Sequence, residues 1–239
     1  MNKEERKIRE RTLRSVALNC FATEKWEDVS VARIAKLAGV AKGTVYLHFA
    51  SKDEICARLA LEFYDELQQK YLQITGTGSE QLKQLISTSF SHYHERAQYR
   101  HVVQICQREH FLVNLDPELT GALQSSRQFQ QERIAVALTK GMRDKTLLPD
   151  AGTRLTGICS TLSGALDIFS HRTDTRRENN AHIHLERTSM ERTKTNQQSP
   201  NEFIEQVTSY IISSVENNAE PTAKSGTAIP TLELTLDVQ

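Results

Sequence analysis

Lys42, Gly43 and Thr44 open a short polar stretch whose residue types suit contact with DNA. A lysine reaches guanine O6 and N7 or a phosphate, a threonine meets a thymine methyl or a phosphate, and glycine lets a backbone come close. Tyr46 and Lys52 carry donors suited to phosphate oxygens, which hold a protein in register without reading bases. These residue types and their spacing favour recognition of double-stranded DNA.

Four more residues of this region are candidates for the same surface: Ser30, Arg33, Leu47 and His48. Three of them have an ordinary alternative role that the sequence leaves open. Ser30 suits the N-cap of a helix, Arg33 suits a solvated helix face, and His48 suits a structural hydrogen bond inside the domain.

Two short helices must position these side chains. Apolar residues at helical spacing predict a first helix over residues 31–38 and a second over 42–49. Gly39 lies between them as the C′ residue, where the chain can turn left-handed without strain at Cβ. The pair is a helix-turn-helix, whose second helix enters the major groove of DNA.

The string IAKLAGVAKGTVYLHFASKDEI, residues 34–55, resembles the DNA-binding domain of the TetR family of transcriptional repressors. The resemblance is close over residues 7–55 and persists downstream only as helix count and order. It implies an all-α homodimer whose C-terminal domain binds a ligand and thereby releases DNA. It also implies that Lys42, Gly43, Thr44 and Leu47 face the bases.

Two residues depart from the family pattern near the motif. Lys25 stands where the family usually has glycine after the first helix, and a left-handed lysine there would cost ~1 kcal/mol. Ala41 replaces a common Ser or Thr at the N-cap of the recognition helix, and loss of such a cap costs about 1 kcal/mol.

The composition of the chain predicts an all-α protein. Among its 239 residues glycine (10) and proline (5) are sparse, and the apolar residues follow the helical period. The formal net charge is zero, but residues 1–50 carry ten Lys or Arg against six Asp or Glu, a basic end suited to polyanions. The four scattered cysteines favour buried thiols in a reduced, cytoplasmic protein. No apolar run approaches the ~20 residues of a membrane span, so no membrane partner is predicted.

We expect three parts along the chain. Residues 1–50 form a three-helix helix-turn-helix domain, residues 51–216 a larger helical domain for ligand binding and dimerisation, and residues 217–239 a flexible tail. The helices predicted for the second part cover residues 51–73, 80–97, 99–111, 117–143, 151–170 and 201–216. Because residues 171–200 are almost devoid of apolar side chains, we expect a mobile insertion there, with a short helix around 185–190.

Two apolar stripes in the last helices predict a four-helix interface between two copies of the chain. Its residues are Leu155, Ile158, Leu162, Leu166, Phe169, Phe203, Val207, Tyr210 and Ile211. The alternative is that the stripes cover the core of their own chain. Small residues among them, Gly157, Ser160 and Gly164, would let another helix approach closely.

Polar residues mixed with apolar ones in the middle helices predict a pocket for a small-molecule effector. Its candidate residues are Leu85, Ser89, Phe90, Tyr93, Gln104, Gln107 and Phe129. Each could equally be an ordinary core or surface residue, and the sequence does not identify the effector.

The sequence leaves two other classes of protein to consider. An enzyme or metal protein is suggested by the histidines of HYHE (His92, His94) and HIH (His182, His184), but no metal-binding, nucleophile-elbow or P-loop motif accompanies them, so no metal or cofactor is predicted. A DNA-bound adaptor of the same fold, which recruits a protein partner, is the second alternative. The sequence favours a dimeric repressor that binds a palindromic operator and is released by a small molecule.

Overall fold

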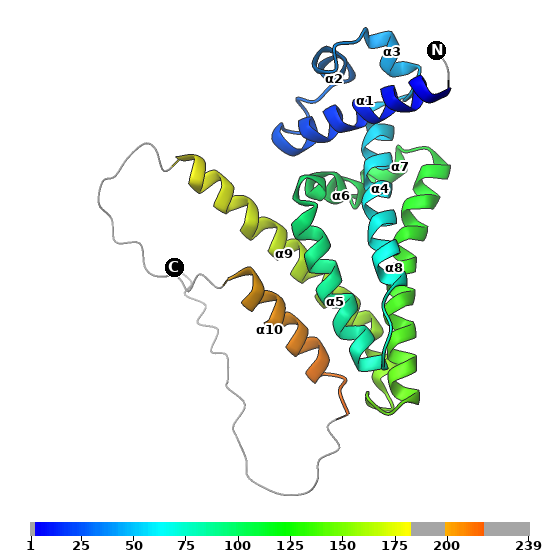
Figure 1. The fold of residues 1–239 in the computed structure, drawn as a ribbon, viewed down its shortest axis with the longest axis vertical. Helices are drawn as coiled ribbons and strands as arrows, with labels where there is room; N and C mark the ends of the chain where they lie inside the picture. Colours follow the sequence, from blue (N-terminus) through cyan, green and yellow to red (C-terminus); the bar gives the residue numbers. More distant parts are fainter. Residues whose placement is uncertain (1–2, 183–198, 218–239) are drawn as a thin grey trace, which may run out of the picture.

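The computed structural model describes residues 3–182 and 199–217, and from residue 170 to 182 only the backbone is described. This part of the chain is helical, with a single isolated bridge between Leu147 and Glu216 and no strand (Figure 1). The all-α prediction is therefore confirmed. In chain order the elements are α1 Lys3–Thr23, α2 Val31–Leu37, α3 Lys42–Tyr46, α4 Lys52–Leu72, α5 Gly78–Glu95, η1 Ala97–Tyr99, α6 Arg100–Cys106, α7 Glu109–Val113, α8 Pro117–Arg143, η2 Ala151–Arg154, α9 Leu155–His182 and α10 Pro200–Ser213.

Helices α1 to α3 form a small unit at one end of the molecule, and α4 runs from it into the larger helical body (Figure 1). The inner face of α1 buries Leu13, Ala17, Cys20 and Phe21. Ile8, which has the helical spacing of this face, is 55% exposed because α1 extends past the rest of the unit. The apolar residues at helical spacing in α1 are therefore buried in the second half of the helix only.

Helix α4 is the common support of both parts. It is buried against α1, α6, α5 and α8, and its N-cap Ser51 accepts a hydrogen bond from the Glu54 amide at 3.0 Å. The Glu54 carboxylate accepts from the Ala50 amide at 2.6 Å, so two backbone donors at this helix start are satisfied by side chains.

The structure corrects several predicted helix boundaries. The stretch 99–111 is broken into η1, α6 and α7, because Arg108 takes an extended conformation and lets Phe111 turn back against Trp26. Helix α3 ends at Tyr46, earlier than the predicted residue 49.

Helix α9 continues to His182, so the first part of the predicted insertion 171–200 is helical. Apolar periodicity ends where burial ends, whereas a helix continues until a glycine, a proline or a cap stops it, and residues 171–182 contain neither glycine nor proline. The predicted short helix at 185–190 and the tail from residue 218 lie outside the described residues.

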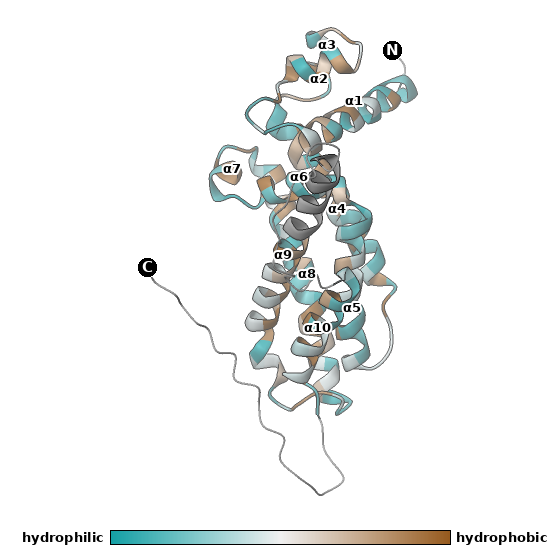
Figure 2. Cartoon of the chain, turned by 90° about the vertical axis from the view of Figure 1, so that its left-hand side faces the viewer, coloured by the Kyte–Doolittle hydropathy of each residue, from teal (hydrophilic) through white to brown (hydrophobic). Residues whose placement is uncertain are grey.

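None of the described helices combines the length and the apolar content that crossing a membrane requires. Figure 2 shows hydrophilic and hydrophobic residues alternating along the described helices, as expected for helices that each have one buried face.

One buried histidine makes the body sensitive to acid. The imidazole Nε2 of His92 lies 3.0 Å from the Phe63 carbonyl, its Nδ1 is buried without a partner among the described residues, and the side chain is fully buried. Burial is the largest effect and lowers the pKa of His92, and the charges of Lys70 and Arg96 lower it further. The hydrogen bond with the Phe63 carbonyl and the charge of Glu66 oppose this shift, but the net direction is downward. The neutral ring is therefore the form that the folded state stabilises.

The unfolded chain binds the proton more readily than the folded chain, so stability is full above the ordinary histidine pKa of about 6.5 and falls as pH drops below it. We expect His92→Gln to reduce this acid sensitivity by up to about 1.4 kcal/mol per pH unit, measured by urea unfolding between about pH 7 and pH 5. His110→Gln, on the exposed part of α7, is the control. Equal pH slopes for wild type and His92→Gln would contradict this prediction.

Candidate DNA interface and effector pocket

The turn between α2 and α3 is made by backbone hydrogen bonds around a left-handed glycine. Gly39 has φ +66°, and its amide donates to the Lys36 carbonyl at 3.3 Å while the Val40 amide donates to the Ala35 carbonyl at 3.0 Å. This is a Schellman motif, which satisfies two carbonyls at the end of α2. The predicted role of Gly39 is confirmed, and the angle between α2 and α3 is fixed by it.

The apolar side of the motif is closed. The side chains of five apolar residues are buried in the core: Val31, Ile34, Ala35, Val45 and Phe49. The side chains that remain on α3 are therefore those of its outer face.

The outer face of α3 is open, and no other part of the described chain covers it. Tyr46 is 49% and Leu47 70% exposed, and Lys42 and Gly43 are exposed as well. The Lys42 ammonium lies 5.7 Å from the centroid of the Tyr46 ring, and Thr44 is half-buried. A Cβ built on Gly43 would meet no atom within 4 Å. An exposed Leu and Tyr beside a lysine and an open glycine form a surface that needs a partner.

Three other predicted DNA-contact residues, Ser30, Arg33 and Lys52, are held by the protein itself. Ser30 Oγ accepts from the Arg33 amide at 3.2 Å as the N-cap of α2, and the Arg33 guanidinium pairs with Glu24 at 3.3 Å. Lys52 Nζ donates to the Trp26 carbonyl at 2.8 Å and lies 4.1 Å from the centroid of that ring. These side chains brace the motif in the free protein.

His48 does not make the internal hydrogen bond that the sequence suggested for it. The ring is half-buried beside Phe49, and both nitrogens are buried without a partner in the described part of the chain. The placement of His48 alone neither supports nor requires a contact with a base.

The prediction that Lys25 has a left-handed backbone conformation is wrong. Among the described residues other than glycine, only Lys145 has a positive φ. The chain leaves α1 through a turn in which the Lys25 carbonyl accepts from the amides of Asp28 and Val29, at 3.0 and 3.3 Å. Such a turn is built with negative φ and needs no glycine.

The missing N-cap at Ala41 is confirmed, because no side chain accepts from the first amides of α3. We expect Ala41→Ser to stabilise the N-terminal unit by about 1 kcal/mol, since the backbone of Ala41 is already extended as an N-cap requires. Urea unfolding followed by the fluorescence of Trp26, the single tryptophan, would measure this change. Ala50→Ser, which precedes a cap already provided by Ser51, is the control. Equal midpoints for Ala41→Ser and wild type would contradict the prediction.

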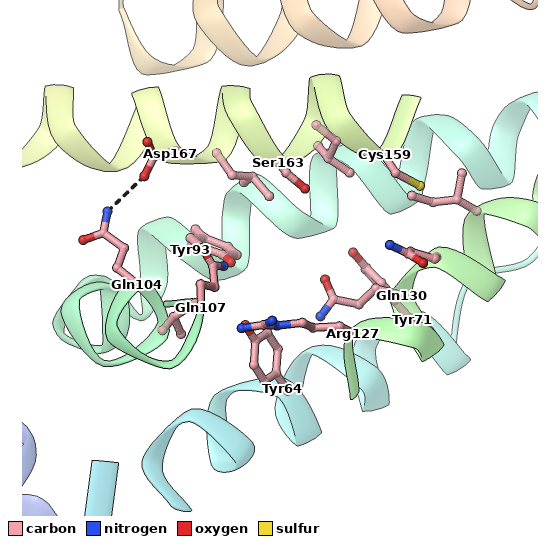
Figure 3. Close-up of a pocket in the computed structure, with 15 residues that line it drawn as sticks. Tyr64, Tyr71, Tyr93, Gln104, Gln107, Arg127, Gln130, Cys159, Ser163 and Asp167 are labelled. Carbon is pink, nitrogen blue, oxygen red and sulfur yellow. Dashed lines mark hydrogen bonds between the residues drawn. The ribbon is translucent and has the colours of Figure 1, made fainter. Parts of the chain in front are cut away.

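A cavity of about 250 Å³ lies in the body, between α4, α5, α6, α8 and α9 (Figure 3). Its apolar lining comes from Val103, Ile134, Cys159, Leu162 and Leu166. Its polar lining comes from Tyr64, Tyr71, Tyr93, Gln104, Gln107, Arg127, Gln130, Gln131, Ser163 and Asp167. Polar groups converging in a partly apolar cavity orient a ligand.

The three tyrosines of the cavity are neutral hydrogen-bonding groups. Burial raises the pKa of Tyr64 and Tyr93, and it raises the pKa of Tyr71 to about 12. The Tyr71 hydroxyl lies 2.6 Å from Ser89 Oγ, which itself donates to the Leu85 carbonyl at 2.7 Å, so Tyr71 is the donor of that pair. The phenols therefore carry no charge at neutral pH.

Comparison with known proteins identifies the N-terminal part. Residues 13–59 match the family model described as bacterial regulatory proteins, tetR family. By this domain, the chain belongs to the TetR family. The HTH-type transcriptional repressor KstR2 of Mycolicibacterium smegmatis is 25% identical over 138 residues, which cover 58% of this chain and 67% of the relative.

Solved structures extend the similarity in fold to the whole TetR-family architecture. A bacterial regulatory protein in the tetR family from Rhodococcus RHA1 superposes with a TM-score of 0.64 at 14% identity, over 90% of this chain and 98% of that one. The transcriptional regulator FadR from Bacillus subtilis, in complex with stearoyl-CoA, superposes with a TM-score of 0.55 at 21% identity, over 83% and 97% of the two chains. At these identities the likeness shows the fold alone.

The cavity of this TetR-family chain contains three of the seven predicted pocket residues, Tyr93, Gln104 and Gln107. Leu85, Ser89 and Phe90 instead lie in the core between α5 and its neighbours, where Phe90 meets the rings of Phe169 and Phe203. Phe129 lies by a separate shallow hollow on the other side of α8.

Sequence reasoning missed most of the lining on α8 and α4. Arg127, Gln130, Gln131 and Ile134 share the i, i+3, i+4, i+7 spacing of one helix face, as Tyr64 and Tyr71 share a seven-residue step. On these faces of α8 and α4, polar residues are mixed with apolar ones in place of a uniformly apolar stripe. This mixed polarity is the sequence signal that could have indicated the cavity.

The predicted dimer residues lie mostly inside this chain. Ile158, Leu162, Leu166, Phe169 and Ile211 are buried, and Leu155, Phe203 and Val207 are half-buried, because α9 and α10 pack this stripe against α5 and α8. Tyr210 alone of the nine is largely exposed, at 69%.

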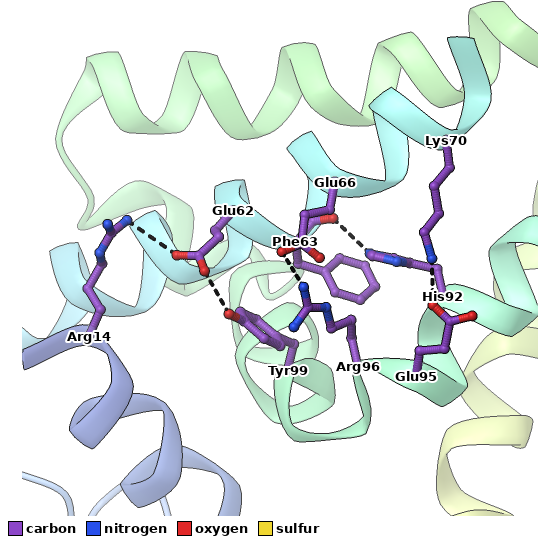
Figure 4. Close-up of polar contacts among 9 residues, drawn as sticks. All are labelled: Arg14, Glu62, Phe63, Glu66, Lys70, His92, Glu95, Arg96 and Tyr99. Atoms are coloured by element: carbon purple, nitrogen blue, oxygen red, sulfur yellow. Dashed lines mark hydrogen bonds and ion pairs between the residues drawn. The ribbon is translucent and has the colours of Figure 1, made fainter. Parts of the chain in front are cut away.

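A line of polar contacts connects the helix-turn-helix unit to the body (Figure 4). The Glu62 carboxylate of α4 accepts from Arg14 of α1 at 3.3 Å and from the Tyr99 hydroxyl of η1 at 2.9 Å. Further along α4, Glu66 pairs with Arg96 at 2.6 Å. Each such partly exposed pair contributes less than ~1 kcal/mol, so the network orients α1 on α4 more than it stabilises the fold.

Among the described residues, no three His, Cys, Asp or Glu side chains gather as metal ligands would. His92 is buried and His94 is exposed, so the two lie on different faces of α5. The HIH motif lies outside the part of the chain whose side chains are described.

Proposed function

We propose that this protein is a ligand-responsive transcriptional repressor, which binds a palindromic operator as a homodimer and is released by a small-molecule effector. The observation that carries the proposal is the outer face of α3, where Lys42, Gly43, Tyr46 and Leu47 are exposed on an otherwise closed helix-turn-helix. Lys42 and Thr44 contact bases, and Tyr46 contacts phosphate.

The dimer forms through the outer face of α9 and α10. On α9 the exposed positions Gly157, Ser160, Gly164 and Ile168 fall on one side of the helix, and a Cβ added at either glycine would meet nothing within 4 Å. Small residues permit the close helix contact of a four-helix interface, with the exposed Tyr210 of α10 at its edge. Two copies place two recognition helices roughly 34–36 Å apart on successive major grooves.

Effector binding acts through α4. Tyr64 and Tyr71 of α4 line the cavity, and Glu62 of the same helix is bonded to Arg14 of α1. A ligand that binds better when α4 is displaced shifts the dimer toward a separation of recognition helices that fits DNA less well.

The relatives support a repressor with this kind of control. KstR2 is named a transcriptional repressor, and FadR was solved with stearoyl-CoA. Because the sequence matches outside the N-terminal domain are weak, the operator and effector of these relatives do not carry over to this chain.

The test is selection of operators from a random duplex library at physiological salt. The wild type should enrich a palindrome, and Lys42→Ala should bind it about 1–3 kcal/mol more weakly if Lys42 reads a guanine. Lys140→Ala, which removes an exposed lysine from α8, is the charge-matched control and should bind as wild type does. If no sequence is enriched by the wild type, or if both variants lose affinity alike, the DNA-reading role of α3 is wrong.

A further inference from the structure

We propose that the effector is a small organic carboxylate, held by Arg127, rather than a long-chain acyl-CoA. The inference rests on the proposed function and names the ligand class of its cavity. Arg127 projects from α8 into the cavity between Tyr64 and Gln130 (Figure 3).

Arg127 carries a positive charge that forms no ion pair among the described residues. Its Nη2 donates to the Cys106 carbonyl at 2.6 Å, and the nearby Tyr64 phenol is neutral because burial raises its pKa. Its Nε is buried and has no partner, and no carboxylate of the described residues lies within ion-pair distance. A half-buried guanidinium with an unused donor is stabilised by a planar anion that accepts from it.

Further donors converge beside this charge. The Tyr93 hydroxyl is protonated and makes no hydrogen bond within the described chain, and the Gln130 and Gln131 amides share the face of α8 that carries Arg127. Ile134, Leu162 and Leu166 form the apolar wall for the body of the ligand. A carboxylate group on a short apolar or aromatic body matches this division of the lining.

The size and charge of the cavity disfavour an acyl-CoA. Its volume of about 250 Å³ lies below the ~300–1,000 Å³ of pockets that enclose drug-sized ligands. A CoA thioester also carries several phosphate charges, whereas Arg127 is the single cationic residue of the lining and Asp167 is an acid at its edge. The Asp167 carboxylate accepts from Gln104 Nε2 at 3.1 Å, on the α6 side of the cavity.

Calorimetric titration of the full-length protein without DNA tests this inference. The ligands are benzoate, phenylacetate and hexanoate, the neutral isostere benzamide, and octanoyl-CoA and stearoyl-CoA. We expect at least one free carboxylate to bind with one site per chain. If benzoate binds, benzamide should bind at least tenfold more weakly than benzoate. Neither CoA thioester should bind as tightly as the best carboxylate.

Three variants assign the contact. Arg127→Gln should weaken carboxylate binding at least tenfold, while Arg143→Gln, the same change at an exposed site of α8, should leave it unchanged. Because Arg127 also bonds to the Cys106 carbonyl, its loss could perturb folding, so Tyr93→Phe provides a second variant. It removes a hydroxyl that bonds to nothing in the described chain and should weaken carboxylate binding several-fold with an unchanged melting temperature.

The inference is overturned if the carboxylates bind Arg127→Gln as well as wild type, if a CoA thioester binds more tightly than every carboxylate, or if no carboxylate binds. Release of operator DNA is measured separately with the same ligands. A carboxylate that binds through Arg127 without releasing DNA would refute the proposed effector response and leave the ligand class intact. Release of DNA by a CoA thioester alone would refute the proposed ligand class and leave the proposed effector response intact.

Discussion

Gly43→Ala should make the free protein more stable and its complex with DNA weaker. The Cβ enters open space, so nothing in the free chain opposes it, and alanine in place of glycine in a helix stabilises by about 0.5–1 kcal/mol. In the proposed complex with DNA, the same Cβ lies on the face of α3 that approaches the duplex, between Lys42 and Thr44. We expect the operator affinity to fall at least about tenfold, which is about 1.4 kcal/mol.

Urea unfolding and fluorescence anisotropy with the selected operator measure the two effects. Gly121→Ala is the matched control, because Gly121 is an exposed helical glycine of α8 with nothing within 4 Å of an added Cβ. It should gain stability in the same way and bind DNA as wild type does. Unchanged affinity in Gly43→Ala would show that this part of α3 does not approach the duplex.

Gly78→Ala is expected to destabilise the helical body by about 3 kcal/mol or more. Gly78 is the first residue of α5, is buried, and donates its amide to Asp144 at 2.8 Å. A Cβ there would overlap the backbone nitrogen and Cα of Gly141 on α8 and lie 2.7 Å from the Ala137 carbonyl. No rotamer relieves a clash with backbone, so α5 and α8 must separate where they cross, and overpacking of this kind costs ~1–3 kcal/mol or more.

Thermal unfolding gives the measurement, and a fall in Tm of roughly 6–12 °C corresponds to that loss for a chain of this size. Gly121→Ala on the same partner helix serves again as the control and should raise Tm slightly. Since α5 and α8 both line the cavity, Gly78→Ala should also weaken binding of the effector. A Tm within 2 °C of wild type would mean that the two helices do not cross as closely as the structure places them.

The DNA-reading motif could be predicted from the sequence because its determinants are local. Gly39 adopts the left-handed conformation expected of it, Ser30 and Ser51 cap the helices expected to follow them, and Val45 and Phe49 are buried on the side that the helical period indicates. Within a few residues, spacing determines which side chains share a face, so the exposure of Lys42, Gly43 and Tyr46 followed from it.

Tertiary structure decided the cavity and the inner and outer faces of α9. Leu162 and Leu166 were expected at a dimer interface, yet α9 packs that stripe against its own chain and leaves Gly157 and Gly164 outward. Arg127 was one polar residue among many in a long helix, and only the approach of α4, α6 and α9 gave it an enclosed space. An apolar stripe predicts that one face of a helix is buried, but it does not predict which surface covers that face, because the hydrophobic effect has no direction. Which surface covers it depends on contacts between residues distant in sequence.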